Sequence, residues 1–245
     1  MALSEEIRSQ GEWLFRWRSY LPLLLAPLLI PAVIQANGTY ESSAHEVGED
    51  TGFIMSMLGL LVRVITIGHT PARTSGRNAN RQIADEVNTT GMYSIVRHPL
   101  YLGNYLIGLG VTIVLLVWWL PVIYSLVFWI YYERIMFAEE AFLRGKFGDA
   151  YLSWANATPA FWPRFRQWRK SDLPFSWLNA MGREYTGLTV VVLGHCGLET
   201  TELLMQDHRI VWEPFYATLL FSGLAVYFTL RHLRRHTSLL KVPGR

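Results

Sequence analysis

Polar, charged and aromatic residues gather at the two ends of one long apolar stretch of the chain. Arg97, His98, Pro99, Tyr101 and Gly103 stand at its start, and Glu139 and Glu140 follow its end. Charged groups beside long apolar helices are costly in lipid, and that cost usually marks a functional site. The acidic pair could bind cationic or hydroxyl groups of a cofactor, or it could be an ordinary helix N-terminus. Spacing alone leaves both interpretations open.

The segment around His98 has the features of a helix start. Pro99 suits the first turn of a helix, where the missing backbone N–H costs nothing. His98 and Tyr101 then lie at this first turn, where free backbone N–H groups can meet a carboxylate. Gly103 permits the close approach of a ligand, although packing against a second helix is the more common use of such a glycine.

A run of arginines precedes this segment. Arg73, Arg77 and Arg81 recur every four residues, so a helix would align them on one face. The planar guanidinium group suits a carboxylate or a phosphate, and we therefore treat Arg73 and Arg77 as candidates that position an anionic substrate. Contact with anionic lipid headgroups is the alternative.

Composition indicates the class of protein. The chain has 245 residues, of which 51% are hydrophobic, 14% aromatic and only 17% charged. A soluble domain carries roughly 25% charged residues, and abundant tryptophan and tyrosine suit the two membrane interfaces. The net charge of +3 is concentrated in particular loops, which argues against a nucleic acid partner. The single cysteine, Cys196, excludes a disulfide framework. We predict one all-α polytopic membrane domain over residues 1–245.

Hydropathy predicts about six transmembrane helices, since a span needs about 20 apolar residues. The predicted spans are residues 15–36, 52–67, 100–117, 119–137, 185–204 and 212–230. The third and fourth form a tight helical hairpin over 100–137, with Pro121 starting the return helix. A cytoplasmic cofactor-binding segment follows this hairpin, and residues 185–231 form an additional C-terminal helix pair.

The distribution of basic residues predicts the orientation. Arginine and lysine lie in alternate connecting segments, and six spans with both termini in the cytoplasm place every one except Arg209 on the inner side. Both ends of the apolar stretch, and with them the predicted active site, then face the cytoplasm. We see no internal repeat, so the repeat signature of many transporters is missing.

Signatures of soluble enzymes are missing from the sequence. It has no Walker loop, no Gly-x-Gly-x-x-Gly after a strand and no Gly-x-Ser-x-Gly. Six histidines are scattered, and we see no partner at metal-ligand spacing for any of them, so we predict no metal. These are His45, His69, His195, His208, His232 and His236.

Several motifs occur together in order. The segment Thr90-Gly91-Met92-Tyr93 precedes Arg97-His98-Pro99-x-Tyr101-x-Gly103, the hairpin follows, and Glu139-Glu140-x-x-Leu143-x-x-x-Phe147-Gly148-x-x-Tyr151 closes the series. This series, over residues 90–163, resembles the isoprenylcysteine carboxyl methyltransferase and phospholipid methyltransferase superfamily. The resemblance implies an integral membrane enzyme that uses S-adenosylmethionine without the soluble Rossmann methyltransferase fold.

The resemblance also implies roles for individual residues. The cofactor pocket is expected to contain Val87, Asn88, Tyr93, Arg97, His98, Pro99, Tyr101, Gly103, Glu139 and Glu140. An arginine shortly before the acidic pair engages the substrate in the family, and the nearest here is Arg134, one position displaced from the usual place. Our candidates for substrate positioning are therefore Arg134, Arg77 and Arg73.

The expected reaction is transfer of a methyl group to an anionic oxygen of a lipid or lipidated substrate that enters from the bilayer. Such a transfer needs alignment and exclusion of water more than acid–base help. The acceptor stays open among a lipid phosphate, as in bacterial relatives that methylate lipid A, a prenylcysteine carboxylate and an amine headgroup. A bacterial inner membrane is the predicted location. An NADPH-dependent membrane reductase is the competing enzyme class, and a transporter is a weaker one.

Overall fold

The computed structural model describes residues 2–18, 21–36, 43–72, 74, 84–206, 208 and 210–245. Within these residues the chain forms eight α-helices and no β-strand, which confirms the predicted all-α class. Arg73, Arg77, Arg81 and Arg209 lie outside the described residues, so the proposed anion-binding role of Arg73 and Arg77 stays a prediction.

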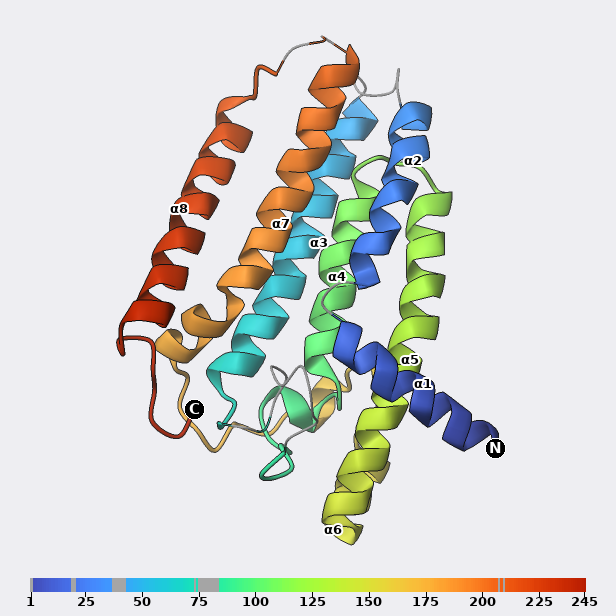
Figure 1. The fold of residues 1–245 in the computed structure, drawn as a ribbon, viewed down its shortest axis with the longest axis vertical. Helices are drawn as coiled ribbons and strands as arrows, with labels where there is room; N and C mark the ends of the chain where they lie inside the picture. Colours follow the sequence, from blue (N-terminus) through green and yellow to red (C-terminus); the bar gives the residue numbers. More distant parts are fainter. Residues whose placement is uncertain are drawn as a thin grey trace.

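Most of the helices run side by side, and the N-terminal helix lies obliquely to them (Figure 1). The helices are α1 (Leu3–Trp17), α2 (Leu29–Ala36), α3 (Ser43–Gly68), α4 (Pro99–Ile113), α5 (Trp119–Phe147), α6 (Asp149–Ala157), α7 (Trp177–Gln206) and α8 (Pro214–His236). Helix α1 lies obliquely across α5, and α6 follows the end of α5 and packs against its last turns. Both termini lie toward the end where α4 begins, which we call the His98 end; the opposite end, where α3 begins, is the His45 end.

Three helices are long and apolar enough to cross a membrane among the described residues, namely α3, α5 and α7. The shorter α4 and residues 26–36 are apolar as well. The first predicted span, 15–36, is not one helix. Helix α1 ends at Trp17, and a 3₁₀ helix from Leu21 to Leu28 leads into α2. Pro27 lies inside that 3₁₀ helix, where a missing N–H disturbs fewer α-helical hydrogen bonds.

The predicted hairpin is present, with different helix ends. Helix α4 ends at Ile113 and α5 begins at Trp119, and Pro121 lies in the first turn of α5 as expected. Helix α5 continues ten residues past the predicted end at 137. Glu139 and Glu140 therefore lie on the last turns of a long helix, which Gly148 ends with a positive φ of 55°. They do not begin a separate segment.

Helices α3 and α4 approach closely along a row of glycines. A Cβ atom at Gly110 would lie 2.3 Å from both the carbonyl oxygen of Gly52 and the hydroxyl of Ser56. Nearer the His98 end, a Cβ at Gly59 would lie 2.6 Å from the carbonyl oxygen of Gly103. Small residues allow this backbone contact, as in other membrane helix pairs. The interface brings α3 residues within reach of the start of α4.

We predict that Gly110→Ala lowers the stability of the protein by about 1–3 kcal/mol, because the new methyl group forces α3 and α4 apart. Gly197→Ala is the control, since a Cβ at Gly197 meets open space. The thermal unfolding midpoints of both variants in detergent test this expectation. Equal midpoints would show that α3 and α4 do not pack as closely as described.

Candidate active site

The segment before α4 is fixed by the chain that follows α5. The backbone N–H of His98 donates to the carbonyl oxygen of Ala160 at 3.2 Å, and the indole Nε1 of Trp154 donates to the carbonyl oxygen of Tyr93 at 3.0 Å. Buried backbone groups need such partners. These bonds hold the segment before α4 against α6 and the chain that follows α6.

His98 lies between the two carboxylates of the acidic pair. Its Nε2 atom is 2.9 Å from Oε1 of Glu140, and its Nδ1 atom is 3.6 Å from Oε2 of Glu139. The Tyr101 hydroxyl donates to Oε2 of Glu139 at 3.0 Å, and Nη1 of Arg97 donates to Oε2 of Glu140 at 3.0 Å. These five residues, which we call the His98 cluster, join the first turn of α4 to the end of α5.

The His98 cluster favours a protonated imidazole. Only 7% of His98 is exposed. Burial lowers the pKa of His98, but the hydrogen bonds and negative charges of Glu139 and Glu140 raise this pKa by more, so the net value lies above the ordinary 6.5. As an imidazolium, the ring donates toward both carboxylates. It therefore offsets part of the charge that the acidic pair concentrates here.

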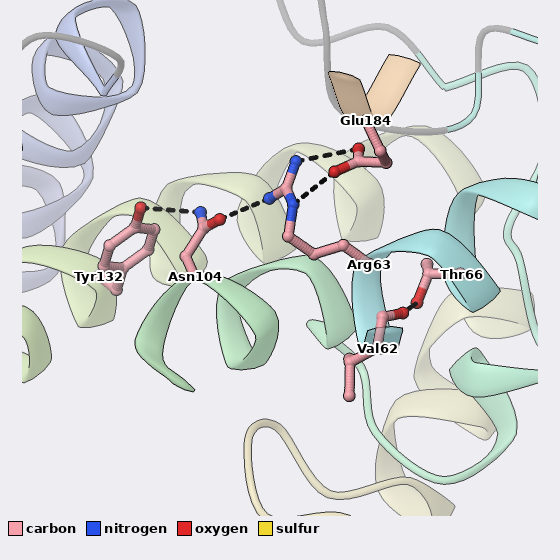
Figure 2. A network of polar contacts seen from close by, with 6 residues as sticks. All are labelled: Val62, Arg63, Thr66, Asn104, Tyr132 and Glu184. Atoms are coloured by element: carbon pink, nitrogen blue, oxygen red, sulfur yellow. Dashed lines mark hydrogen bonds and ion pairs between the residues drawn. The ribbon is translucent and has the colours of Figure 1, made fainter. Parts of the chain in front are cut away.

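A second polar cluster joins side chains from four helices of the bundle (Figure 2). Nε and Nη2 of Arg63, on α3, donate to the two carboxylate oxygens of Glu184, on α7, at 2.7 and 3.0 Å. Nη1 of Arg63 donates to the side-chain oxygen of Asn104 on α4, and Nδ2 of Asn104 donates to the Tyr132 hydroxyl on α5 at 3.0 Å. This Arg63 network links all four helices.

Aromatic rings join the two clusters. The ring of Tyr101 stacks on the ring of His98, with the two centroids 5.5 Å apart. The ring of Tyr101 also contacts the tilted ring of Tyr132, at a centroid distance of 4.8 Å. Arg18, just past α1, is close enough to Tyr101 and Glu139 for their charges to interact. The site is thus enclosed by α1, α3, α4, α5 and α7.

The other predicted cofactor residues lie around the same end. Val87 and Tyr93 pack against Tyr151 and Trp154 of α6. Asn88 donates through Nδ2 to the Thr74 hydroxyl at 3.1 Å. Pro99 is buried at the start of α4.

Gly103 lies on the side of α4 that faces α3. A Cβ at Gly103 would lie 2.5 Å from Cγ of Arg63 and 2.8 Å from the carbonyl oxygen of Gly59. Close helix packing therefore explains this glycine, as it does Gly59. Its predicted contact with the cofactor stays a prediction.

Arg134 is not part of the His98 cluster. Five positions along α5 separate it from Glu139, which places the two side chains about 140° apart around the helix. Its Nε donates to Oε1 of Gln10 at 2.9 Å and its Nη1 to the carbonyl oxygen of Ile130 at 2.8 Å. Arg134 instead lines an open groove of about 730 Å³ between α1 and α5. The groove is lined by Ser9, Gln10, Trp13, Leu14, Val127, Ile130, Tyr131 and Arg134.

Sequence reasoning missed three polar residues near the site. These residues are Arg18, Arg63 and Glu184. A lone arginine in a predicted span was a usable signal for Arg63, because ionisable residues inside membrane helices usually have a partner. Nothing in the sequence indicates that the partner is Glu184, which lies 121 positions away.

Residues 51–150 match the family described as phospholipid methyltransferase. This range contains most of α3, all of α4 and α5, and both halves of the His98 cluster. Together with the apolar helices, the match indicates a methyltransferase of the membrane-embedded class. The match supports the resemblance to the isoprenylcysteine carboxyl methyltransferase and phospholipid methyltransferase superfamily that the motifs of residues 90–163 predicted.

Three curated proteins illustrate the similarity. A nickel-cobalt-cadmium resistance protein of Alcaligenes xylosoxydans xylosoxydans is 29% identical over 184 residues, or 72% of this chain and 79% of that protein. A cobalt-zinc-cadmium resistance protein of Cupriavidus metallidurans is 29% identical over 187 residues, or 72% and 78%. The protein-S-isoprenylcysteine O-methyltransferase of Schizosaccharomyces pombe is 35% identical over 72 residues, or 29% and 30%. No solved structure matches the chain significantly.

We predict that Arg63→Met lowers stability by about 3–5 kcal/mol, because it leaves the buried Glu184 carboxylate without its main partner. The double variant Arg63→Met, Glu184→Met removes both charges and should recover much of that loss. Thermal unfolding of the wild type, both single variants and the double variant measures the coupling. A double variant no more stable than Arg63→Met would contradict a paired role for the two side chains.

The raised pKa of His98 predicts a pH-dependent contribution to stability. A raised pKa in the folded state means that this contribution is complete below the ordinary value of 6.5 and is lost as pH rises through the folded value. The gap in thermal midpoint between wild type and His98→Gln should therefore shrink by a few degrees between about pH 6 and about pH 9. A gap that stays constant, or widens with pH, would rule out this protonated state.

Proposed function

We propose that the protein transfers a methyl group from S-adenosylmethionine to an anionic oxygen of a membrane lipid or lipidated substrate. The observation that carries this proposal is the His98 cluster. Two separate motifs of the superfamily, around His98 and at Glu139–Glu140, meet there within hydrogen-bonding distance. The proposal rests on that arrangement together with the family match.

The polar atoms near the cluster fit such a cofactor. Oε1 of Glu139 makes no hydrogen bond with any residue that the structure describes. In the same part of the chain, Nε of Arg97 and the Tyr151 hydroxyl are buried and have no hydrogen-bond partner among the described residues. Buried polar groups of this kind normally find partners, and an adenosyl amino acid offers an ammonium group, a carboxylate and ribose hydroxyls. When bound, the cofactor supplies an activated methyl group on a sulfonium.

The protein's own task is to align the acceptor and exclude water. The groove between α1 and α5 supports entry of an apolar chain from the side, because Trp13, Leu14 and Val127 line it. In this proposal, Arg134 contacts the headgroup in the groove. Arg18, whose charge interacts with Glu139 and Tyr101, steers the acceptor oxygen toward the His98 cluster.

We further propose that the chain crosses the bacterial inner membrane six times, with both termini and the His98 end in the cytoplasm. The arrangement of basic residues supports this orientation. A soluble cofactor made in the cytoplasm would then reach the His98 cluster directly, while the acceptor stays in the bilayer.

The family match favours methyl transfer over the NADPH-dependent reduction that the arginine run also allowed. For the acceptor we favour a lipid phosphate or carboxylate over an amine headgroup, because an amine needs a general base and the basic residues here suit an anion. Two relatives are named for resistance to divalent metals. We therefore take cells challenged with such a metal as the source of acceptor lipids.

The test begins with titration of detergent-purified protein with S-adenosylhomocysteine and NADPH. We expect saturable binding of the adenosyl ligand alone, weakened at least about tenfold by Glu139→Gln, because a charge-assisted hydrogen bond is lost. Glu133→Gln, which changes an exposed carboxylate on the same helix, is the matched control and should bind normally.

The acceptor assay uses S-adenosylmethionine with a labelled methyl group and lipid extracts. Transfer should give a labelled lipid whose bond reveals the acceptor as phosphate, carboxylate or amine. Arg18→Gln should raise KM for that lipid and leave adenosyl binding unchanged. Binding of NADPH alone, or adenosyl binding that is indifferent to Glu139→Gln, would overturn the proposed function.

A further inference from the structure

A cluster of metal-ligating side chains lies at the His45 end, opposite the proposed active site. His45 and Glu49 lie one turn apart on α3, and Glu202 lies near the end of α7. Nε2 of His45 is 3.0 Å from Oε2 of Glu202 and 4.0 Å from Oε1 of Glu49. One donor atom from each of these three residues lies within 4.8 Å of the other two. The prediction that no histidine has a partner at ligand spacing is therefore wrong for His45.

The cluster contains more carboxylate groups than a single ion pair with His45 would require. Glu199, one turn before Glu202 on α7, is only 8% exposed, and its charge interacts with Glu49, Glu202 and His45. It makes no hydrogen bond or ion pair with any residue that the structure describes. Burying three carboxylates beside one imidazole is costly unless a cation compensates them.

Nearby basic side chains are scarce. The described segments at this end, residues 29–36, 43–50, 113–119, 198–206 and 210–216, contain no lysine or arginine. The connection between α7 and α8 contains His208 and one arginine, Arg209, which lies outside the described residues. A bound cation is the direct way to balance these carboxylates.

The donor set specifies the kind of cation. One imidazole nitrogen and two or three carboxylate oxygens suit divalent first-row transition metals, whereas Mg²⁺ and Ca²⁺ favour oxygen ligands alone. Ligands of a tetrahedral Zn²⁺ site lie about 3.3 Å apart when each bond is about 2.0–2.1 Å. The donors here are near that spacing, so small side-chain rotations would close the site.

Further contacts orient the ligands. The Tyr216 hydroxyl, from α8, donates to Oε1 of Glu49 at 2.7 Å. Hydrogen bonds of this kind around a metal site fix ligand direction and raise affinity. His45 is itself 2% exposed, so its ring is held by packing.

We propose that His45, Glu49 and Glu202 bind one divalent transition-metal ion of the Zn²⁺, Co²⁺ and Ni²⁺ class, with Glu199 as a fourth carboxylate ligand or charge partner. This site is separate from the His98 cluster and goes beyond the proposed methyl transfer. It joins α3 to α7, with Tyr216 adding α8, and so ties the C-terminal helix pair to the rest of the bundle.

The test uses full-length protein in detergent that has been stripped with a chelator. Titration with ZnCl₂ by calorimetry, and with CoCl₂ by visible absorption, should show one equivalent of metal bound. Affinity should fall at least about tenfold in His45→Gln and in Glu202→Gln, which keep the side-chain size. Glu46→Gln is the matched control, because it changes an exposed carboxylate next to His45, and it should bind normally.

Folding of each variant is checked by its thermal midpoint and by gel filtration, which require neither cofactor nor acceptor. MgCl₂ should produce no saturable signal. Absence of saturable Zn²⁺ binding to folded wild type would overturn the proposal. Equal binding by wild type and a folded His45→Gln, Glu202→Gln double variant would do the same. Neither result bears on methyl transfer, and failure of S-adenosylhomocysteine binding would leave the metal result intact.

Discussion

The pairing of Arg63 with Glu184 constrains the whole bundle. The arginine is 18% exposed at its side chain and the glutamate 5%, so neither charge has much access to solvent. An isolated charge at this depth is strongly unfavourable, whereas the bidentate pair satisfies both groups. Since the pair spans α3 and α7, and Asn104 and Tyr132 extend it to α4 and α5, it fixes how far each helix slides along its neighbours. That register brings Gly59 against Gly103 and sets the start of α4 beside the end of α5.

The parts of the site that sequence predicted are those carried by contiguous motifs. His98 and Tyr101 lie within one turn, Glu139 and Glu140 are adjacent, and a short connection between two helices forces the motifs together. Helical phase is harder to anticipate once a helix end is misplaced. The predicted end of the fourth span at residue 137 assigned Arg134 and Glu139 to different segments. Both residues lie on the continuous helix α5, where their side chains point to different faces.

The parts that sequence did not predict depend on contacts between distant helices. A single charge such as Arg63 hardly changes the average hydropathy of a span, so the span is recognised and the charge is overlooked. The spacing of His45 and Glu49 was visible as one helical turn, but Glu202 reaches them only through the packing of α7 against α3. The predicted span 15–36 was also described incompletely by hydropathy. Its apolar residues indicate one continuous helix, whereas the backbone forms a 3₁₀ helix with Pro27 inside it, followed by the α-helix α2.

Helix α7 contributes to both polar sites although it lies outside the region that matches the methyltransferase family. Eighteen residues separate His45 from Arg63 on α3, and eighteen separate Glu184 from Glu202 on α7. Eighteen residues make about five turns, or roughly 27 Å. His45 and Arg63 therefore lie on the same face of α3, and Glu184 and Glu202 lie on the same face of α7. The length of roughly 27 Å is close to the roughly 30 Å of a bilayer's apolar core, so in the membrane arrangement that we propose the two clusters would lie near opposite faces of the bilayer. The two helices run antiparallel, and both contacts require the same axial offset. A shift of α7 along α3 would therefore break both contacts together, and α7 belongs to the framework that positions the site.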